Sequence, residues 1–187
     1  MLLFNMFPMS SFKEFFIKEI KPALMKELGY ANMHAVPSLV KVVINVGAGE
    51  AVTNKNAIAK IQEQISLIAG QHAVITKARK SVSAFKIRQG LPIGVKVTLR
   101  GAKMYDFLQK LVGVVIPGFR DFRGIDASVV DQHGNLNLGL TEQTLFPEIE
   151  YDKIDKTRGL QVTVVTTAKD KNSGMLLFQK LGIPFKK

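Results

Sequence analysis

Seven cations within one short stretch are the most chemically distinctive feature of this sequence. They are Lys77, Arg79, Lys80, Lys86, Arg88, Lys96 and Arg100. Residues 64–105 contain no acid and hold eight of the 26 basic residues of the chain. The rest of the chain has 18 basic and 15 acidic residues, so most of the net charge of +11 is concentrated in this run. Solvated surfaces normally mix both signs, and the run therefore indicates a binding site for a polyanion.

The two ends of this basic run have different patterns. Residues 77–81 place small side chains between long cations, which is typical of an exposed loop. In residues 93–100 the apolar residues alternate with Lys96, Thr98 and Arg100, which therefore share one face of a strand. Cations and a hydroxyl on one sheet face can hold phosphates, although a single strand of this kind would also fit an ordinary solvated face. Lys41, in an earlier β-branched run, is placed apart from this cluster.

The sequence has no recognisable catalytic or metal-binding constellation. Its three histidines, at positions 34, 72 and 133, are far apart and lack the spacing of metal ligands. The chain has no Cys, which excludes disulfides, thiolate metal sites and Cys nucleophiles. A Gly47-x-Gly49 pair follows a predicted strand, but Val52 occupies the place of the third glycine of a dinucleotide fingerprint. We therefore expect no cofactor.

Two further patterns keep an enzymatic alternative open. A late acidic cluster comprises Glu148, Glu150, Asp152 and Asp155. These carboxylates can act as an acid–base pair or bind a hard cation, but a solvated loop that faces basic patches explains them more simply. An enzyme for an anionic substrate would have to use Ser81, Ser83 or Thr98 near its cations. The other function class, which the acid-free basic run favours, is a structural protein that binds nucleic acid.

Hydrophobic periodicity predicts a mixture of helices and strands. Helices are expected over 12–28, 54–69, 104–115 and 170–181. The first has Ser11 and Glu14 at capping-box spacing, and Pro22 is expected either to kink it or to begin its second part. Strands are expected over 39–46, 73–76, 84–88, 93–100 and 160–166, with a hairpin formed by 128–131 and 136–140 around a turn at 132–135.

The order of these elements predicts an α+β fold. Without a regular β-α-β alternation, the sheet is expected to be largely antiparallel, with helices on one face and the other face open for a polar ligand. The length fits a single domain over residues 10–187, preceded by an apolar extension over 1–9 in which Met9 is an alternative start. No apolar run is long enough for a membrane helix.

Six blocks of the sequence resemble a known family. The blocks are Ile75–Val82, Phe85–Gly90, Pro92–Gly94, Lys96–Gly101, Arg120–Gly124 and Phe146–Ile149. They are similar to the signature of the bacterial-type large-subunit ribosomal protein number five, the 5S ribosomal RNA-binding family. The resemblance runs from about Phe12 to Lys187. It implies a curved antiparallel sheet and no catalysis.

The resemblance also divides the basic run between two RNA partners. It implies that Asn45, Gln71, Thr98 and Arg100 contact 5S ribosomal RNA, to which the strand alternation adds Lys96. Amide and hydroxyl groups suit an RNA surface because they can meet 2′-hydroxyls and phosphates. The loop formed by Lys77, Ala78, Arg79, Lys80 and Ser81 matches the family's protruding loop, which reaches a transfer RNA in the ribosomal P site.

Further partners follow from the same resemblance. They are the 23S-type ribosomal RNA, the neighbouring 5S-associated ribosomal proteins of the central protuberance, and ribosomal protein number thirteen of the small-subunit head, reached across an intersubunit bridge. The implied location is the cytoplasmic ribosome of a bacterium, with an organellar ribosome as the alternative. No membrane partner is expected.

The absence of a ligand cluster generates the first prediction. We expect folding to need no metal or nucleotide, so adding a chelator to the pure protein should leave its melting temperature unchanged. Differential scanning calorimetry with and without the chelator provides the measurement. A large drop in melting temperature would show that a metal contributes to folding.

Overall fold

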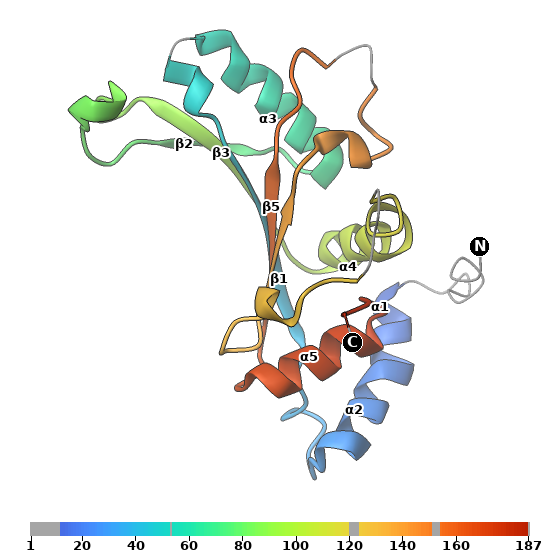
Figure 1. Cartoon of the computed structure of the whole chain (residues 1–187). Helices are drawn as coiled ribbons and strands as arrows, with labels where there is room; N and C mark the ends of the chain where they lie inside the picture. Colours follow the sequence, from blue (N-terminus) through green and yellow to red (C-terminus); the bar gives the residue numbers. More distant parts are fainter. Residues whose placement is uncertain (1–11, 53, 120–123, 151–153, 187) are drawn as a thin grey trace. The chain divides into compact units, whose positions relative to one another are not determined.

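A computed structural model describes residues 12–52, 54–119, 124–150 and 154–186 (Figure 1). The chain forms two compact units. The first unit comprises residues 1–42, 100–138 and 163–187, and the second comprises 43–99 and 139–162. The single domain expected over 10–187 stays a prediction, and the extension over 1–9 lies outside the described residues.

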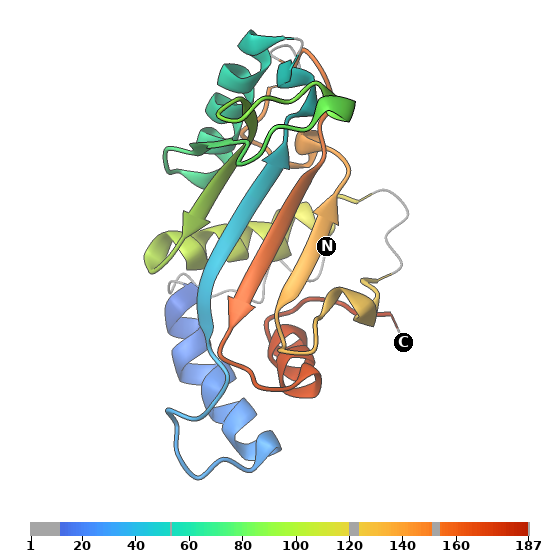
Figure 2. The ribbon, with the colours of Figure 1, turned by 90° about the vertical axis from the view of Figure 1, so that its left-hand side faces the viewer.

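Five strands form one sheet in the order β2-β3-β1-β5-β4. Their bounds are β1 Leu39–Gly47, β2 Val74–Lys77, β3 Pro92–Leu99, β4 Leu136–Leu140 and β5 Leu160–Thr166. Neighbouring strands run in opposite directions (Figure 2). Together with the helices, this sheet confirms the predicted α+β class.

The second unit is built around helix α3 (Lys55–Ala69), which packs on β3. Asn54 caps its first turn by accepting a hydrogen bond from the backbone N–H of Asn56, and Gly70 ends it in the left-handed conformation. The apolar positions recur every three or four residues, so Ile61 and Ile65 are buried on one side of the helix. The predicted helix over 54–69 is thereby confirmed.

The same packing leaves one face of β3 uncovered. Val95, Val97 and Leu99 are buried, whereas Lys96 is exposed. Figure 2 looks onto the side of β3 and β1 that α3 does not cover. In β1 the burial alternates in the same way, with Ile44 and Val46 buried on either side of an exposed Asn45. The two-residue alternation predicted for residues 93–100 is therefore confirmed in β3, and β1 shows the same alternation around Asn45.

The first unit contains the remaining long helices. They are α1 Phe12–Phe15, the π-helical turn η2 Phe16–Ile20, α2 Lys21–Leu28, α4 Ala102–Lys110 with its π-helical extension η5 Leu111–Val115, and α5 Lys171–Lys180. Helix α1 packs against α4, and the rings of Phe16 and Tyr105 lie 5.8 Å apart. Among the described residues no helix is long and apolar enough to span a membrane.

Pro22 explains the interruption within the first predicted helix. It lies in the first turn of α2, where a missing N–H is tolerated. Just before it the helix widens, and the N–H of Lys21 donates to the carbonyl of Phe16. A π-helical turn thus precedes Pro22, and Pro22 lies at the start of the second part of the helix, which confirms one of the two expected alternatives. Ser11, the expected cap, lies outside the described residues.

Two predicted strands are wrong. Residues 84–88 overlap a short 3-10 turn, η4 Ser83–Phe85, and Lys86 adopts a positive φ of 55°. Residues 127–129 form another 3-10 turn, η6, so the hairpin predicted around His133 has only one regular strand, β4. Its turn is nevertheless present, because Val130 pairs with Leu136 in an antiparallel bridge. Asp131 fixes that turn, because its carboxylate accepts hydrogen bonds from the backbone N–H groups of His133 and Asn135.

A buried arginine ties together separate segments of the second unit. The side chain of Arg158 is 7% exposed and donates two hydrogen bonds to Asp155, at 2.8 and 3.1 Å, and a third to Glu50. Lys60 and Lys156 complete the cluster on its solvent side. The guanidinium of Arg158 holds the pKa values of both carboxyl groups below their usual range. Part of the predicted acidic cluster therefore has a structural role.

We predict that Arg158→Met lowers the free energy of unfolding by about 2 kcal/mol at pH 7, because both carboxylates lose their shared donor. The usual pKa values of Glu50 and Asp155 are 4.5 and 3.8, and folding lowers both. Their stabilisation is thus fully present above about pH 4.5 and is lost as the pH falls through the folded-state values. The difference in unfolding free energy between the unsubstituted protein and Arg158→Met should therefore become smaller below about pH 4.

Urea unfolding at several pH values provides the measurement. Lys18→Met serves as the control, because it breaks an exposed pair with Glu14 whose side chains are 72% and 52% exposed. Such a pair contributes about 0.5 kcal/mol or less. Equal losses of unfolding free energy in the two variants would mean that the Arg158 cluster stabilises the fold no more than an exposed ion pair does.

Candidate nucleic-acid interface

The uncovered face of the second unit brings together residues from three segments. We define it by Asn45 on β1, Lys96 and Thr98 on β3, and Gln71 in the turn that precedes β2. Asn45 and Lys96 are exposed, and Thr98 and Gln71 are half-buried. The face thus presents an amide, an ammonium and a hydroxyl group, and these donors match the groups of an RNA backbone.

A direct hydrogen bond joins two of the predicted site residues. The Nε2 of Gln71 donates to the carbonyl of Thr98 at 3.3 Å, across 27 residues of sequence. Two side chains of α3 hold the turn that carries Gln71 by binding the backbone of Ala73. The side-chain amide of Gln62 donates to the Ala73 carbonyl at 2.7 Å, and the Ser66 hydroxyl accepts from the Ala73 N–H at 3.0 Å. Gln71 is therefore held beside β3.

Gly94 allows the strands of this face to approach closely. A Cβ at this position would lie 2.8 Å from the carbonyl oxygen of Val46 and 2.9 Å from the hydroxyl of Thr76. Both distances are shorter than real side chains permit, and the nearest obstacle is backbone that cannot move aside. Glycine is therefore required where β3 passes β1 and β2.

Of the two other cations considered for this face, Arg100 is placed differently from the expectation. Arg100 is exposed and follows β3 by one residue, so it lies beyond the end of the strand. Lys41 was expected apart from the cluster, and it lies on β1 four residues before Asn45, in the part of the chain that belongs to the first unit. The expectation for Lys41 stays a prediction.

The predicted loop over 77–81 begins a longer hairpin between β2 and β3. Lys77 is the last residue of β2, and Arg79, Lys80 and Ser81 follow as exposed residues. The loop was expected to have almost nothing to bury. Ala78 is nevertheless buried, with only 7% of its surface exposed. Its N–H donates to Leu91 at 2.8 Å, and its carbonyl accepts from Gly90 at 2.9 Å.

Beyond Ala78, further backbone pairing shapes what we call the hairpin end, residues 78–91. Val82 and Ile87 exchange hydrogen bonds of 2.9 and 3.1 Å, and the Ser81 hydroxyl accepts from the N–H of Gln89 at 2.9 Å. A shallow groove on this end is lined by Ser81, Ser83, Lys86, Ile87, Arg88 and Gln89. Lys86 and Arg88 belong to the basic run but were not predicted as site residues.

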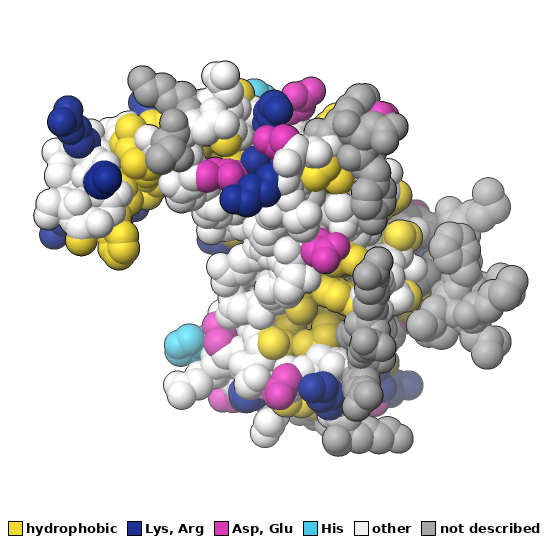
Figure 3. Space-filling model, turned by 45° about the horizontal axis from the view of Figure 1, so that its top comes forward, with side chains coloured by type: hydrophobic (Ala, Val, Ile, Leu, Met, Phe, Trp, Pro, Cys, Tyr) yellow, Lys and Arg dark blue, Asp and Glu magenta, His cyan; other side chains and the backbone are white. Residues whose placement is uncertain are grey.

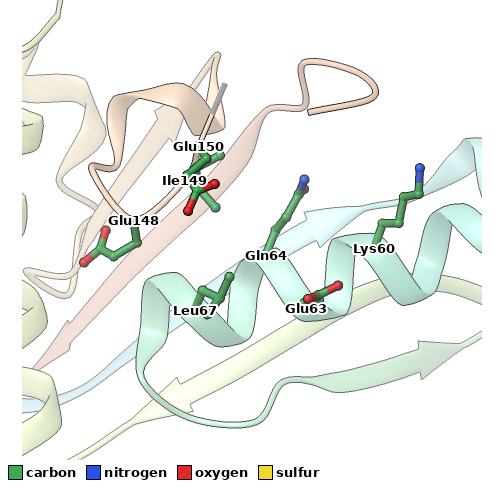
Figure 4. Close-up of a pocket in the computed structure, with 7 residues that line it drawn as sticks. All are labelled: Lys60, Glu63, Gln64, Leu67, Glu148, Ile149 and Glu150. Carbon is green, nitrogen blue, oxygen red and sulfur yellow. The ribbon is translucent and has the colours of Figure 1, made fainter. Parts of the chain in front are cut away.

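The acids of the second unit gather elsewhere. A cavity of about 320 Å³ is lined by Lys60, Glu63, Gln64, Leu67, Glu148, Ile149 and Glu150. Figure 4 shows these side chains coming from α3 and from the segment at 148–150. Three carboxylates against one ammonium repel phosphate groups, so this cavity does not extend the basic surface. Asp152 lies outside the described residues.

Within the described ranges no three His, Asp or Glu side chains are arranged to hold a metal ion. The Nε2 atom of His72 lies 3.1 Å from the side-chain Nε2 of Gln62, so this histidine helps to hold the turn that carries Gln71. Ser81, one candidate nucleophile, is instead engaged by the backbone of Gln89.

Two family models match consecutive parts of the chain. The model of ribosomal protein L5 matches residues 32–88, and the model of the C-terminus of the same ribosomal family matches residues 92–185. The chain belongs to the ribosomal protein L5 family. It is therefore a structural protein of the ribosome that binds ribosomal RNA, and it is not an enzyme. The alternative of an enzyme acting on an anionic substrate is thereby excluded.

Curated relatives cover nearly the whole chain. The large ribosomal subunit protein uL5 of Desulfotalea psychrophila is 50% identical over 179 residues, which are 96% of this chain and 100% of the relative. The protein of the same name from Fervidobacterium nodosum is 54% identical over 175 residues, covering 94% and 95% of the two chains. That from Roseiflexus sp. strain RS-1 is 51% identical over 174 residues, covering 93% and 97%. The chain is thus a structural constituent of the large ribosomal subunit.

The uncovered face generates a prediction about salt dependence. If three or four phosphates are neutralised there, the slope of log affinity against log salt should be roughly −2 to −4. Lys96→Ala and Arg100→Ala should each weaken RNA binding and make this slope shallower by about 0.7 to 0.9 for each phosphate that is no longer neutralised. Filter binding over a salt series measures both effects.

Lys26→Ala is the matched control, because Lys26 is an exposed cation on α2, outside the uncovered face. It should change neither the affinity nor the slope. A flat salt response of the unsubstituted protein would contradict an electrostatic contact with RNA on this face.

Proposed function

We propose that this chain holds 5S ribosomal RNA in the central protuberance of the large ribosomal subunit through the uncovered face. The observation that carries this proposal is the convergence of Asn45, Gln71, Lys96 and Thr98 on the sheet face opposite α3 in the second unit. The direct bond from Gln71 to Thr98 supports it further. Arg100 adds charge where β3 ends. The resemblance to the family also implies that Asn45, Gln71, Thr98 and Arg100 contact 5S ribosomal RNA.

The experiment for this proposal is purification of the tagged protein after gentle lysis, followed by identification of the bound RNA. We expect 5S ribosomal RNA in stoichiometric amount. Thr98→Val keeps the side-chain volume but removes the hydroxyl, so it should reduce the recovered RNA without unfolding the protein. Recovery of ribosomal RNA without the 5S species would contradict the proposal.

We also infer a second contact, between the hairpin and a transfer RNA in the P site. Its support is the separation of the charges, because Arg79 and Lys80 lie on the hairpin, beyond the strand that carries Lys96. The hairpin extends away from α3 within the second unit (Figure 1). Such a projection can reach a partner that the sheet face does not contact.

The remaining contacts rest on the family resemblance alone. They are the 23S-type ribosomal RNA, neighbouring 5S-associated proteins, and protein number thirteen of the small-subunit head through an intersubunit bridge. We assign no residues to them. The bacterial source of the relatives supports a cytoplasmic bacterial ribosome as the location.

The division of the basic run generates the next prediction. Replacing Lys77, Arg79 and Lys80 together by Ala should leave the stability nearly unchanged, because all three side chains are exposed and Ala78 keeps its backbone pairing. The affinity for 5S RNA should also survive, whereas transfer RNA should dissociate faster from the P site.

The test is to rebuild ribosomes with the triple variant and to measure 5S RNA content and P-site transfer RNA dissociation separately. Thermal unfolding of the free variant provides the control for folding. Loss of 5S RNA with normal retention of transfer RNA would mean that the two parts of the basic run have been assigned to the wrong partners.

A further inference from the structure

An exposed aromatic ring occupies the hairpin end. Phe85 is 71% exposed, more than any other large apolar side chain among the described residues, and Val82 nearby is 40% exposed. The space-filling view shows apolar side chains beside dark-blue cations on the projecting hairpin (Figure 3). Exposing a ring of this size to water is unfavourable, and an exposed apolar group among polar neighbours commonly marks a contact with a partner.

Hydrogen bonds fix the backbone that carries this ring. Phe85 ends the turn η4, after which Lys86 takes a positive φ of 55° and its N–H donates to the carbonyl of Ser83 at 3.0 Å. The paired residues Val82 and Ile87 close the turn. A non-glycine residue at positive φ is costly, so a surrounding structure must stabilise it. The tip is therefore an ordered platform for the ring.

The charges around the ring select its partner. Arg79, Lys80, Lys86 and Arg88 are exposed on the same hairpin end, and residues 64–105 contain no acid. A partner of this surface must therefore carry negative charge as well as an apolar face. An RNA with an unstacked base has both, because its phosphates are charged and the face of the base is aromatic.

We propose that Phe85 stacks on an unpaired nucleobase of the RNA that the hairpin contacts. The adjacent groove, with its hydroxyls at Ser81 and Ser83 and its cations at Lys86 and Arg88, receives the sugar–phosphate backbone of the same nucleotide. A base inside a helix has both faces covered by its neighbours, so the partner is an unstacked base of a loop or bulge. This inference rests on the proposed contact between the hairpin and RNA.

Ribosomes rebuilt with Phe85 variants test the stacking. Phe85→Ala should speed the dissociation of P-site transfer RNA about ten-fold, because base–aromatic stacking contributes strongly to RNA binding. Phe85→Tyr should stay within about two-fold of the unsubstituted protein, since it keeps the ring. Phe85→Leu should resemble Phe85→Ala, because it retains apolar surface but has no aromatic face. Full retention with Phe85→Leu would indicate ordinary apolar packing and overturn the proposal.

The 5S RNA content of the same ribosomes distinguishes the two RNA sources. Faster transfer RNA dissociation assigns the stacked base to transfer RNA, whereas loss of 5S RNA assigns it to ribosomal RNA, and either result supports stacking. Normal behaviour of Phe85→Ala in both measurements overturns it. Val74→Ala is the control, because Val74 is 57% exposed on β2, outside the hairpin end.

A photoreactive phenylalanine analogue at position 85 identifies the partner directly. Crosslinks to an unpaired base support the inference, and crosslinks only to another ribosomal protein overturn it. The triple variant of Lys77, Arg79 and Lys80 separates this result from the proposed function. If that variant retains both RNAs normally, the hairpin does not bind RNA through its cations. If it loses transfer RNA while every Phe85 variant is normal, only the stacking is wrong.

Discussion

The packing of α3 on one face of β3 is the constraint on which the rest of the second unit depends. Burying Val95 and Val97 beneath the helix directs Lys96 and Thr98 to the opposite face, because the side chains of a strand alternate. A shift of one residue would bury an ammonium group and expose the core valines, at a large cost in free energy. The residues that stabilise the fold therefore also fix which groups the uncovered face presents.

A second set of contacts keeps the carboxylates of the second unit away from its basic surfaces. Arg158 binds Glu50 and Asp155, so two carboxylates of the second unit are neutralised internally. Glu63, Glu148 and Glu150 line the cavity at α3, whose exposed Leu67 shows that this side of the helix faces solvent. The uncovered face and the hairpin are thus left with a single sign of charge. This separation concentrates the net positive charge of the chain on these two surfaces.

The sequence predicted what depends on short-range periodicity. The spacing of isoleucines identified α3, and the alternation in residues 93–100 identified β3 together with the side chains on its outer face. The sequence did not predict the hydrogen bond from Gln71 to Thr98, because it depends on how the turn after α3 meets the strand. Residues 84–88 were misassigned because their alternation favours a strand, whereas the tip needs a tight turn with Lys86 at positive φ. Arg88 and Phe85 gain their importance only from that turn.

The hairpin shows how a segment with little core can still be ordered. Ala78 is buried and its backbone is paired with Gly90 and Leu91, so cross-strand hydrogen bonds satisfy the chain while its side chains remain exposed. Cations on such an arm attract any phosphate backbone without fixing its register. A ring held at the tip adds what charge lacks, because stacking requires an available base at one defined place. In the proposed contact with RNA, Arg79 and Lys80 therefore provide affinity, and Phe85 provides the position.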